Sequence, residues 1–163
     1  MTSQEFIRRC TTGEEPQPRT GWKQVGSIGW DGRHVYSYGT HYPLLIALEI
    51  GAGQVVYIRN DRGYSSTTGK HISWAGPYAA GHVEIPRTVG ATYATSPEGI
   101  KESAQQEIRD RQNEIVALDE KIAARPRYAA SYRAAQDRVC DRITNLRHVI
   151  SLADQAIAYA KNN

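Results

Sequence analysis

Cysteine and long apolar runs are scarce in this chain of 163 residues. Its two cysteines, Cys10 and Cys140, are far apart in sequence, and neither belongs to a C-x-x-C pair or adjoins a histidine. A disulfide framework and a zinc finger are therefore disfavoured. No stretch of about 18 consecutive apolar residues occurs, which disfavours a membrane span. We expect free thiols, no signal peptide, no membrane association and a cytoplasmic location.

Complete catalytic signatures are also missing. There is no G-x-S-x-G elbow, and the histidines form no H-x-H or H-x-x-x-H pair. The run from Gly63 to Lys70 resembles a phosphate loop, but five residues instead of four separate Gly63 from Gly69. We therefore predict no metal and no cofactor, and favour a binding protein over an enzyme. If the protein is an enzyme, His41 and His71 are the candidate catalytic residues.

Residue types are distributed unevenly along the chain. All three tryptophans and most tyrosines precede residue 97, whereas Ala, Arg, Glu, Gln and Ile dominate after it, as in long helices. The net charge of +3 permits nucleic-acid binding without requiring it. Two structural halves are expected.

The first half reads as strands. Gly13 to Pro18 offers no apolar periodicity, so residues 1–20 are expected to form a flexible arm. Strand patterns follow at residues 22–30, 34–38, 44–50 and 54–59, separated by turn sequences, and the apolar run 44–48 is typical of a central strand covered on both faces. A short helix is expected at 71–80 and an edge strand at 85–93. Residues 21–95 therefore predict an α+β domain: a small twisted antiparallel sheet with one short helix.

The second half, residues 96–163, predicts a long antiparallel two-helix hairpin resembling a coiled coil. Ser96-Pro97-Glu98 is a helix start, and Pro126 ends the first helix near Ala124. Apolar positions recur every three or four residues in both helices, so Leu118 should face Val139 across the hairpin. These positions form a narrow apolar stripe on each helix, and two such stripes bury little apolar surface on their own. The hairpin therefore needs a third partner, either the sheet or a second copy of the hairpin. We expect a homo-oligomer formed through residues 97–161.

The segment from Arg59 to His71 is the candidate ligand site. Hydroxyls and a cation at a helix start favour an anion, and aromatic residues interleaved with cations can stack on bases. The simpler alternative is that these residues form a cap and a turn, with the aromatic residues in the core. The candidate ligand-binding residues are Tyr36, Tyr38, Arg59, Asn60, Arg62, Tyr64, Thr67, Thr68, Lys70 and His71.

Two motifs resemble a known family. A Tyr36-Ser37-Tyr38-Gly39-Thr40 strand precedes a segment reading Asn60 … Tyr64-Ser65-Ser66-Thr67-Thr68-Gly69-Lys70-His71. The pair resembles a small domain of uncharacterised phage and prophage proteins, with a YSYGT strand followed by N…YS-x-TT-x-KH, and covers about residues 20–80. Because that family has no established activity, the resemblance implies a phage origin and an infected bacterial cytoplasm, not a chemistry.

Three functions remain open from the sequence. The first is a non-enzymatic phage accessory protein whose sheet and Arg59–His71 loop bind nucleic acid or a nucleotide-like anion. The second is a protein that inhibits a host or anti-phage defence factor through its helical hairpin. The third is a small enzyme that uses His41 and His71.

Overall fold

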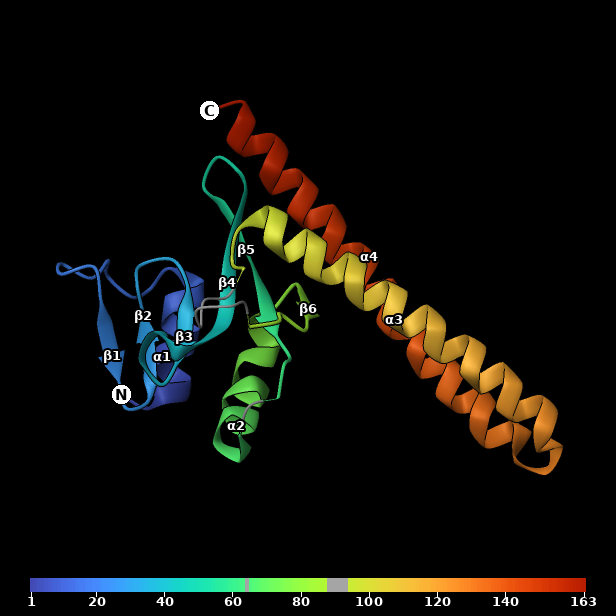
Figure 1. The fold of residues 1–163 in the computed structure, drawn as a ribbon. Coiled ribbons are helices and arrows are strands. Elements are labelled where there is room, and N and C mark those ends of the chain that lie inside the picture. The colour runs from blue at the N-terminus through green and yellow to red at the C-terminus, as the bar shows by residue number, and fades with distance from the viewer. Residues whose placement is uncertain (64, 88–93) are drawn as a thin grey trace.

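The computed structural model describes residues 1–63, 65–87 and 94–163. These residues form an α+β fold, as predicted, in which a twisted sheet is followed by a long helical hairpin (Figure 1). The strands are β1 (Lys23–Val25), β2 (Ile28–Trp30), β3 (Val35–Ser37), β4 (Tyr42–Gly51), β5 (Gln54–Asn60) and β6 (Gly81–Val83). The helices are α1 (Ser3–Thr12), α2 (Ser66–Ala75), α3 (Pro97–Ala124) and α4 (Ala129–Lys161), with 3-10 turns η1 (Gly39–His41), η2 (Gly76–Tyr78) and η3 (Pro126–Tyr128).

The sheet has the strand order β1-β2-β3-β4-β5-β6. Neighbouring strands are antiparallel except β5 and β6, which run parallel because α2 carries the chain back across the sheet between them. The central position of β4 is confirmed, with every residue from Tyr42 to Leu48 buried. The expected turns at Asp31-Gly32 and at residues 51–53 also connect neighbouring strands.

The first expected strand is wrong in detail. Residues 22–30 form the two short strands β1 and β2, because Gly26 adopts a left-handed φ of 58° and turns the chain between them. An edge strand lies at Gly81–Val83, and most of the strand expected at 85–93 falls at residues 88–93, outside the described residues. The short helix begins at Ser66, five residues earlier than expected.

The expected flexible arm at residues 1–20 is also wrong. Ser3–Thr12 forms α1, capped by the side chain of Thr2 and ended by Gly13 in a left-handed conformation. Phe6, Ile7 and Cys10 are buried against the sheet. The Gly and Pro residues from position 13 onward end this helix without preventing it, since one buried apolar face suffices to hold a short helix in place.

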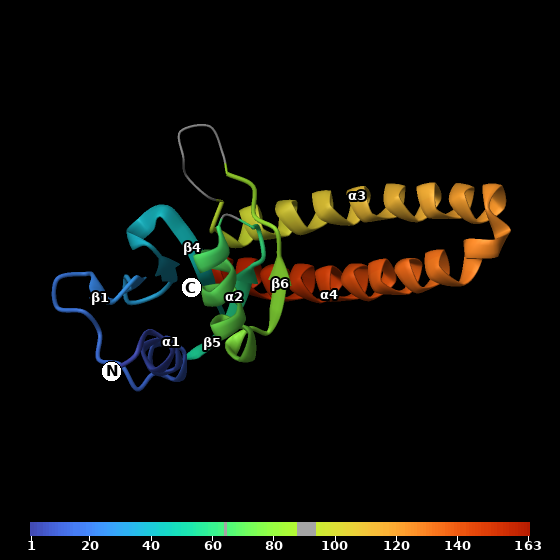
Figure 2. The ribbon, with the colours of Figure 1, turned by 90° about the horizontal axis from the view of Figure 1, so that it is seen from below.

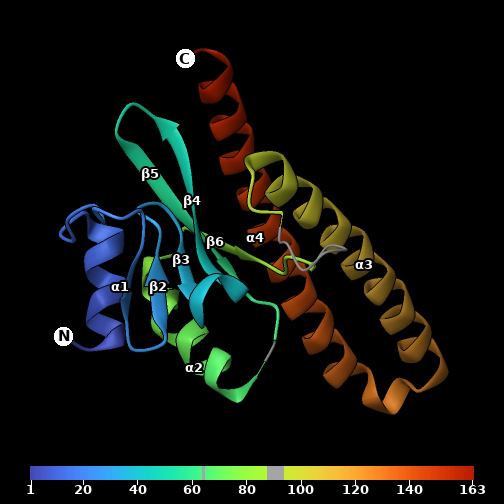
Figure 3. The same cartoon turned by 60° about the vertical axis from the view of Figure 1, so that its left-hand side comes forward.

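The sheet is covered on both faces (Figures 2 and 3). One core unites α1 and α2 with β2, β3 and the first half of β4, through residues such as Phe6, Trp30 and Leu45. A second core packs α3 and α4 against β4, β5 and β6, through residues such as Ile58 and Leu146. Gly81 permits the close approach of β6 to α4, because a Cβ there would meet Val149 Cγ2 at 2.7 Å.

The helical hairpin has two different halves. Its basal half covers the sheet, so the sheet supplies the third partner that the stripes required. The distal half projects beyond the sheet (Figures 1 and 2) and packs only helix on helix. Leu118 and Val139, which were predicted to face each other, share one apolar cluster there, and Ile143 joins them. Neither these helices nor any other in the described ranges has the length and apolar character needed to cross a bilayer.

Candidate functional site

Three residues of the predicted Arg59–His71 site are buried inside the protein. Asn60 and Thr68 are fully buried, and His71 is 2% exposed. Asn60 Oδ1 accepts hydrogen bonds from the backbone N–H groups of Arg62 and Ile85, each at 3.1 Å. Tyr42 also donates to the carbonyls of Asn60 and Arg62, so these side chains fix the course of the loop.

His71 is held by two serines. Its Nδ1 lies 2.7 Å from Ser37 Oγ, and its Nε2 lies 3.1 Å from Ser27 Oγ. The rings of Tyr38 and Trp74 flank it, with centroids at 5.6 and 5.2 Å. Burial lowers the pKa of His71 below its ordinary value, so the ring is neutral near pH 7.

The proposed His41 and His71 catalytic pair is not assembled. His41 is exposed on η1, and the described contacts of His71 do not include it. Both nitrogens of His71 lie within hydrogen-bonding distance of serine hydroxyls and not of His41. No group of three or more His, Cys, Asp or Glu side chains in the described ranges is arranged to hold a metal ion.

The start of α2 does not present free donors to an anion in the way the sequence indicated. Ser65, not Thr67 or Thr68, caps the helix, and its Oγ accepts from the Thr68 N–H at 3.2 Å. The Gly69 N–H donates to the Ser65 carbonyl at 3.0 Å as an ordinary helical bond. The capping alternative therefore describes this segment better than the anion site does.

Arg59 belongs to a cluster of charged side chains between the sheet and the hairpin. Arg142 Nε donates to Glu107 at 2.7 Å and its Nη1 to Asp61 at 3.0 Å, while Arg59 pairs with Asp61 at 2.6 Å. Burial raises the pKa of Glu107 and lowers that of Arg142. We call this cluster the junction network; it comprises Arg59, Asp61, His82, Glu107, Arg111 and Arg142.

Some predicted residues do face solvent. Arg62, Lys70 and Tyr38 are exposed, and Tyr38 adopts a left-handed φ of 57° that is uncommon for a bulky residue. Thr67 is half-buried, and Tyr36 packs on Trp22 while donating to Asp31 at 2.8 Å. Tyr64 lies outside the described residues. The exposed remainder of the predicted site is therefore small.

A second polar surface, whose residues were not among the candidate ligand-binding residues predicted from the sequence, lies at the tip of the hairpin. Lys121, Arg125, Arg127 and Arg133 are all exposed, and within the described residues none of the four forms an ion pair. Tyr128 is 44% exposed, with the Arg127 guanidinium 4.7 Å from its ring centroid. We call these five residues the basic tip. The signal was present in the sequence, because residues 121–136 contain no acidic residue.

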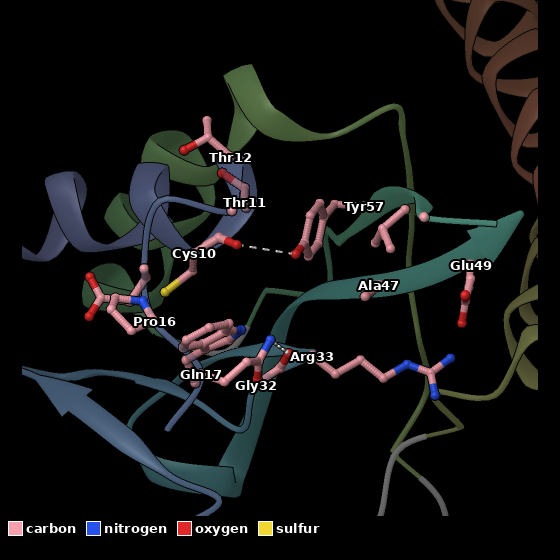
Figure 4. Close-up of a pocket in the computed structure, with 15 residues that line it drawn as sticks. Cys10, Thr11, Thr12, Pro16, Gln17, Gly32, Arg33, Ala47, Glu49 and Tyr57 are labelled. Atoms are coloured by element: carbon pink, nitrogen blue, oxygen red, sulfur yellow. Dashed lines mark hydrogen bonds between the residues drawn. The ribbon is translucent and has the colours of Figure 1, made fainter. Parts of the chain in front are cut away.

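A cavity of about 690 Å³ lies on the α1 side of the sheet (Figure 4). The end of α1 and the segment after it, the β2–β3 turn and the β4–β5 hairpin form its walls. The buried carboxylate of Glu15 pairs there with Arg9 at 2.9 Å and with Lys23, and this hydrogen bond from Lys23 lowers the pKa of Glu15. No sequence pattern indicates this cavity, since its walls come from segments that are distant along the chain.

Comparison of the chain with protein-family models, with curated proteins and with solved structures found no match.

Proposed function

We propose that the protein is a non-enzymatic nucleic-acid-binding protein that contacts phosphates through the basic tip. The observation that carries the proposal is a set of four exposed cations at the end of a projecting hairpin, none of which has an ion-pair partner among the described residues. Arg and Lys neutralise phosphates and release counterions, which gives binding that does not depend on sequence.

The shape of the hairpin supports this proposal. The 28 residues of α3, at a rise of about 1.5 Å each, make a rod of about 40 Å, so the tip can reach a ligand that the sheet does not touch. Tyr128 adds an exposed ring on which an unpaired base can stack. Under the phage resemblance, the nucleic acid would be that of an infected bacterium or its phage.

The experiment measures the affinity for a labelled 20-nucleotide single strand by fluorescence anisotropy between 50 and 200 mM salt. We expect an affinity that falls steeply with salt. The double variant Arg125→Ala/Arg133→Ala should reduce the slope of log K against log salt by about 1.4, from about 0.7 per phosphate contact. The matched control is Arg147→Ala/Lys161→Ala, which removes the same charge from exposed positions outside the tip.

A third variant separates the tip from the loop. Arg62→Ala/Lys70→Ala removes exposed cations of the surface that the sequence indicated. If this variant loses affinity for the strand and the tip variant keeps it, the nucleic-acid site is the Arg59–His71 loop and not the basic tip. If the tip variant and its control lose the same affinity, binding depends only on net charge. If the affinity of the parent protein does not change with salt, phosphate contacts are excluded.

The alternative function, inhibition of a host or defence protein by the hairpin, is supported by one observation. Val116 on the distal half of α3 is 57% exposed, whereas the stripe residues Leu146 and Ile150 pack towards the sheet. In this alternative, a partner protein or a second copy of the chain would cover the distal half around Val116. Light scattering that detects a dimer in the parent protein and a monomer in Val116→Ser would favour this protein-binding role.

A further inference from the structure

Two adjoining hollows mark the surface of the basic tip. The first has a volume of about 420 Å³ and the second of about 410 Å³, both within the range of about 300–1,000 Å³ typical of ligand pockets. The first is lined by Ala124, Arg125, Pro126, Arg127 and Tyr128, and the second by Ala117, Glu120, Lys121, Ala124, Arg125 and Tyr132. Because Ala124 and Arg125 line both, the two hollows share a wall, and a ligand can extend from one into the other.

Each hollow contains a tyrosine whose ring is held by the protein. Tyr128 ends η3 and Tyr132 lies in the first turn of α4, four residues later, which is the spacing of neighbours on a helix surface. The Arg127 guanidinium lies 4.7 Å from the centroid of the Tyr128 ring and donates to its hydroxyl at 2.6 Å. Tyr132 is half-buried and packs against the apolar cluster of Leu118 and Val139. Rings fixed before a ligand arrives lose little entropy when a base stacks on them.

The charges that line the two hollows favour a phosphate. The linings include the cations Lys121, Arg125 and Arg127 and the acid Glu120. Arg125 lies in the wall common to both hollows, and Lys121 precedes it by four residues at the end of α3. An arginine binds a phosphate through two parallel hydrogen bonds. A cation between two hollows therefore suits the phosphate that links two nucleotides.

We propose that the basic tip binds two consecutive unpaired nucleotides of a single strand. One base stacks on Tyr128 and the next on Tyr132, and Arg125 binds the phosphate between them. This site rests on the proposed function and specifies its ligand, because phosphate contacts alone do not distinguish a single strand from a duplex.

The two rings select against base-paired ligands. In a duplex the faces of the bases are covered by the stack, so only an unpaired strand offers them to a protein side chain. Every base has a flat face on which an aromatic ring can stack, so the site tolerates any sequence. The ligand class is therefore single-stranded nucleic acid without a preferred base.

The test measures the affinity of the full chain for three labelled probes by fluorescence anisotropy at 100 mM salt. The probes are a 20-nucleotide single strand of mixed sequence, the same strand annealed to its complement, and an abasic strand with the same sugar-phosphate backbone. We expect the single strand to bind at least tenfold more tightly than the abasic strand, since each stacked base raises the affinity about fivefold or more. It should also bind more tightly than the duplex, although the duplex has the higher charge density.

Substitutions of the two tyrosines assign the rings. Tyr128→Leu and Tyr132→Leu should each lower the affinity for the single strand about fivefold or more, towards that for the abasic strand. Tyr128→Phe and Tyr132→Phe keep the ring and should retain the affinity of the parent protein. Tyr159→Leu is the matched control, because Tyr159 is a half-buried tyrosine of α4 outside both hollows. Tyr128 is exposed, so its leucine variant should fold, and circular dichroism checks the helix content of Tyr132→Leu.

The probes distinguish failure of the stacking site from failure of the proposed function. Equal affinities for the single strand and the abasic strand, or tighter binding of the duplex, would overturn the stacking site and leave salt-dependent phosphate binding by the tip intact. Leucine variants that fold and bind the single strand as tightly as the parent protein would overturn it as well. If none of the three probes binds with an affinity that falls with salt, the proposed function itself is overturned.

Discussion

The Arg59–His71 loop and the basic tip have similar compositions and opposite structures. Both carry arginines, a lysine and a tyrosine. In the loop, Asn60, Thr68 and His71 are buried and bonded to neighbouring groups, whereas every cation of the tip faces solvent. The difference follows from position, since the loop lies between the sheet and α2, and the tip lies at the end of a rod.

This contrast shows which polar segments are available to a ligand. A polar side chain within reach of backbone donors and acceptors becomes part of the fold, because burying it without a partner is costly. A polar side chain beyond reach of the rest of the chain keeps its bonding capacity for something else. The predictions below test this division, from the largest expected effect to the smallest.

The largest expected difference is between two arginines of α4, in their contributions to the free energy of unfolding. Arg142→Ala should lower the free energy of unfolding by about 3 kcal/mol, because it leaves the buried carboxylate of Glu107 and the partly buried carboxylate of Asp61 without their shared cation. Arg133→Ala on the exposed tip should change it by less than about 0.5 kcal/mol. Urea denaturation followed by circular dichroism measures both.

A small effect of Arg142→Ala would mean that the junction network is solvated in solution and adds little to stability. Arg142→Met is the informative companion, since it keeps the length of the side chain and removes only the charge and its hydrogen bonds. If the methionine variant is as stable as the parent, the contribution of Arg142 is packing.

The next largest difference in stability is expected between substitutions of Asn60 and Arg62 in the loop. Asn60→Ala should destabilise the protein by about 2 kcal/mol, because the N–H groups of Arg62 and Ile85 lose their common acceptor. Arg62→Ala keeps its backbone N–H and truncates an exposed side chain, so it should be close to neutral in the same denaturation assay. If the two variants lose equal stability, the inward bonding of Asn60 is not what holds the loop.

Local sequence patterns predicted most of the fold. Ser96-Pro97 and Pro126 mark the ends of α3, and the apolar run in β4 marks the central strand, since both signals act within a few residues. The arm at residues 1–20 was wrong because the burial of Phe6 depends on a sheet formed later in the chain. The parallel pairing of β6 likewise depends on the path of α2.

The candidate site was less predictable than the fold. Composition marks Asn60, Thr68 and His71 as chemically capable, yet it cannot show that Ile85, Ser65 and Ser37 supply their partners. These contacts join residues up to 34 positions apart in the case of His71. The acid-free stretch at residues 121–136 was readable, but its exposure follows from the projection of the hairpin.

The pH dependence of stability should show the inward bonding of the histidines. Burial lowers the pKa of both His71 and His34 in the folded protein, and His34 Nδ1 accepts the Ala47 N–H at 3.0 Å. In the unfolded chain histidine protonates near pH 6.5. Below that pH the unfolded state binds more protons than the folded state, so stability present above pH 6.5 is lost as the pH falls towards the folded pKa values.

Each such histidine contributes at most about 1.4 kcal/mol per pH unit within that window. The free energy of unfolding, measured by urea titration between pH 5 and 7.5, should therefore decline on acidification, and His71→Asn should make the decline shallower. The double variant His34→Asn/His71→Asn should flatten it further. An unchanged slope in both variants would mean that these rings become protonated in the folded protein, and that the serines around His71 hold the charged ring as readily as the neutral one.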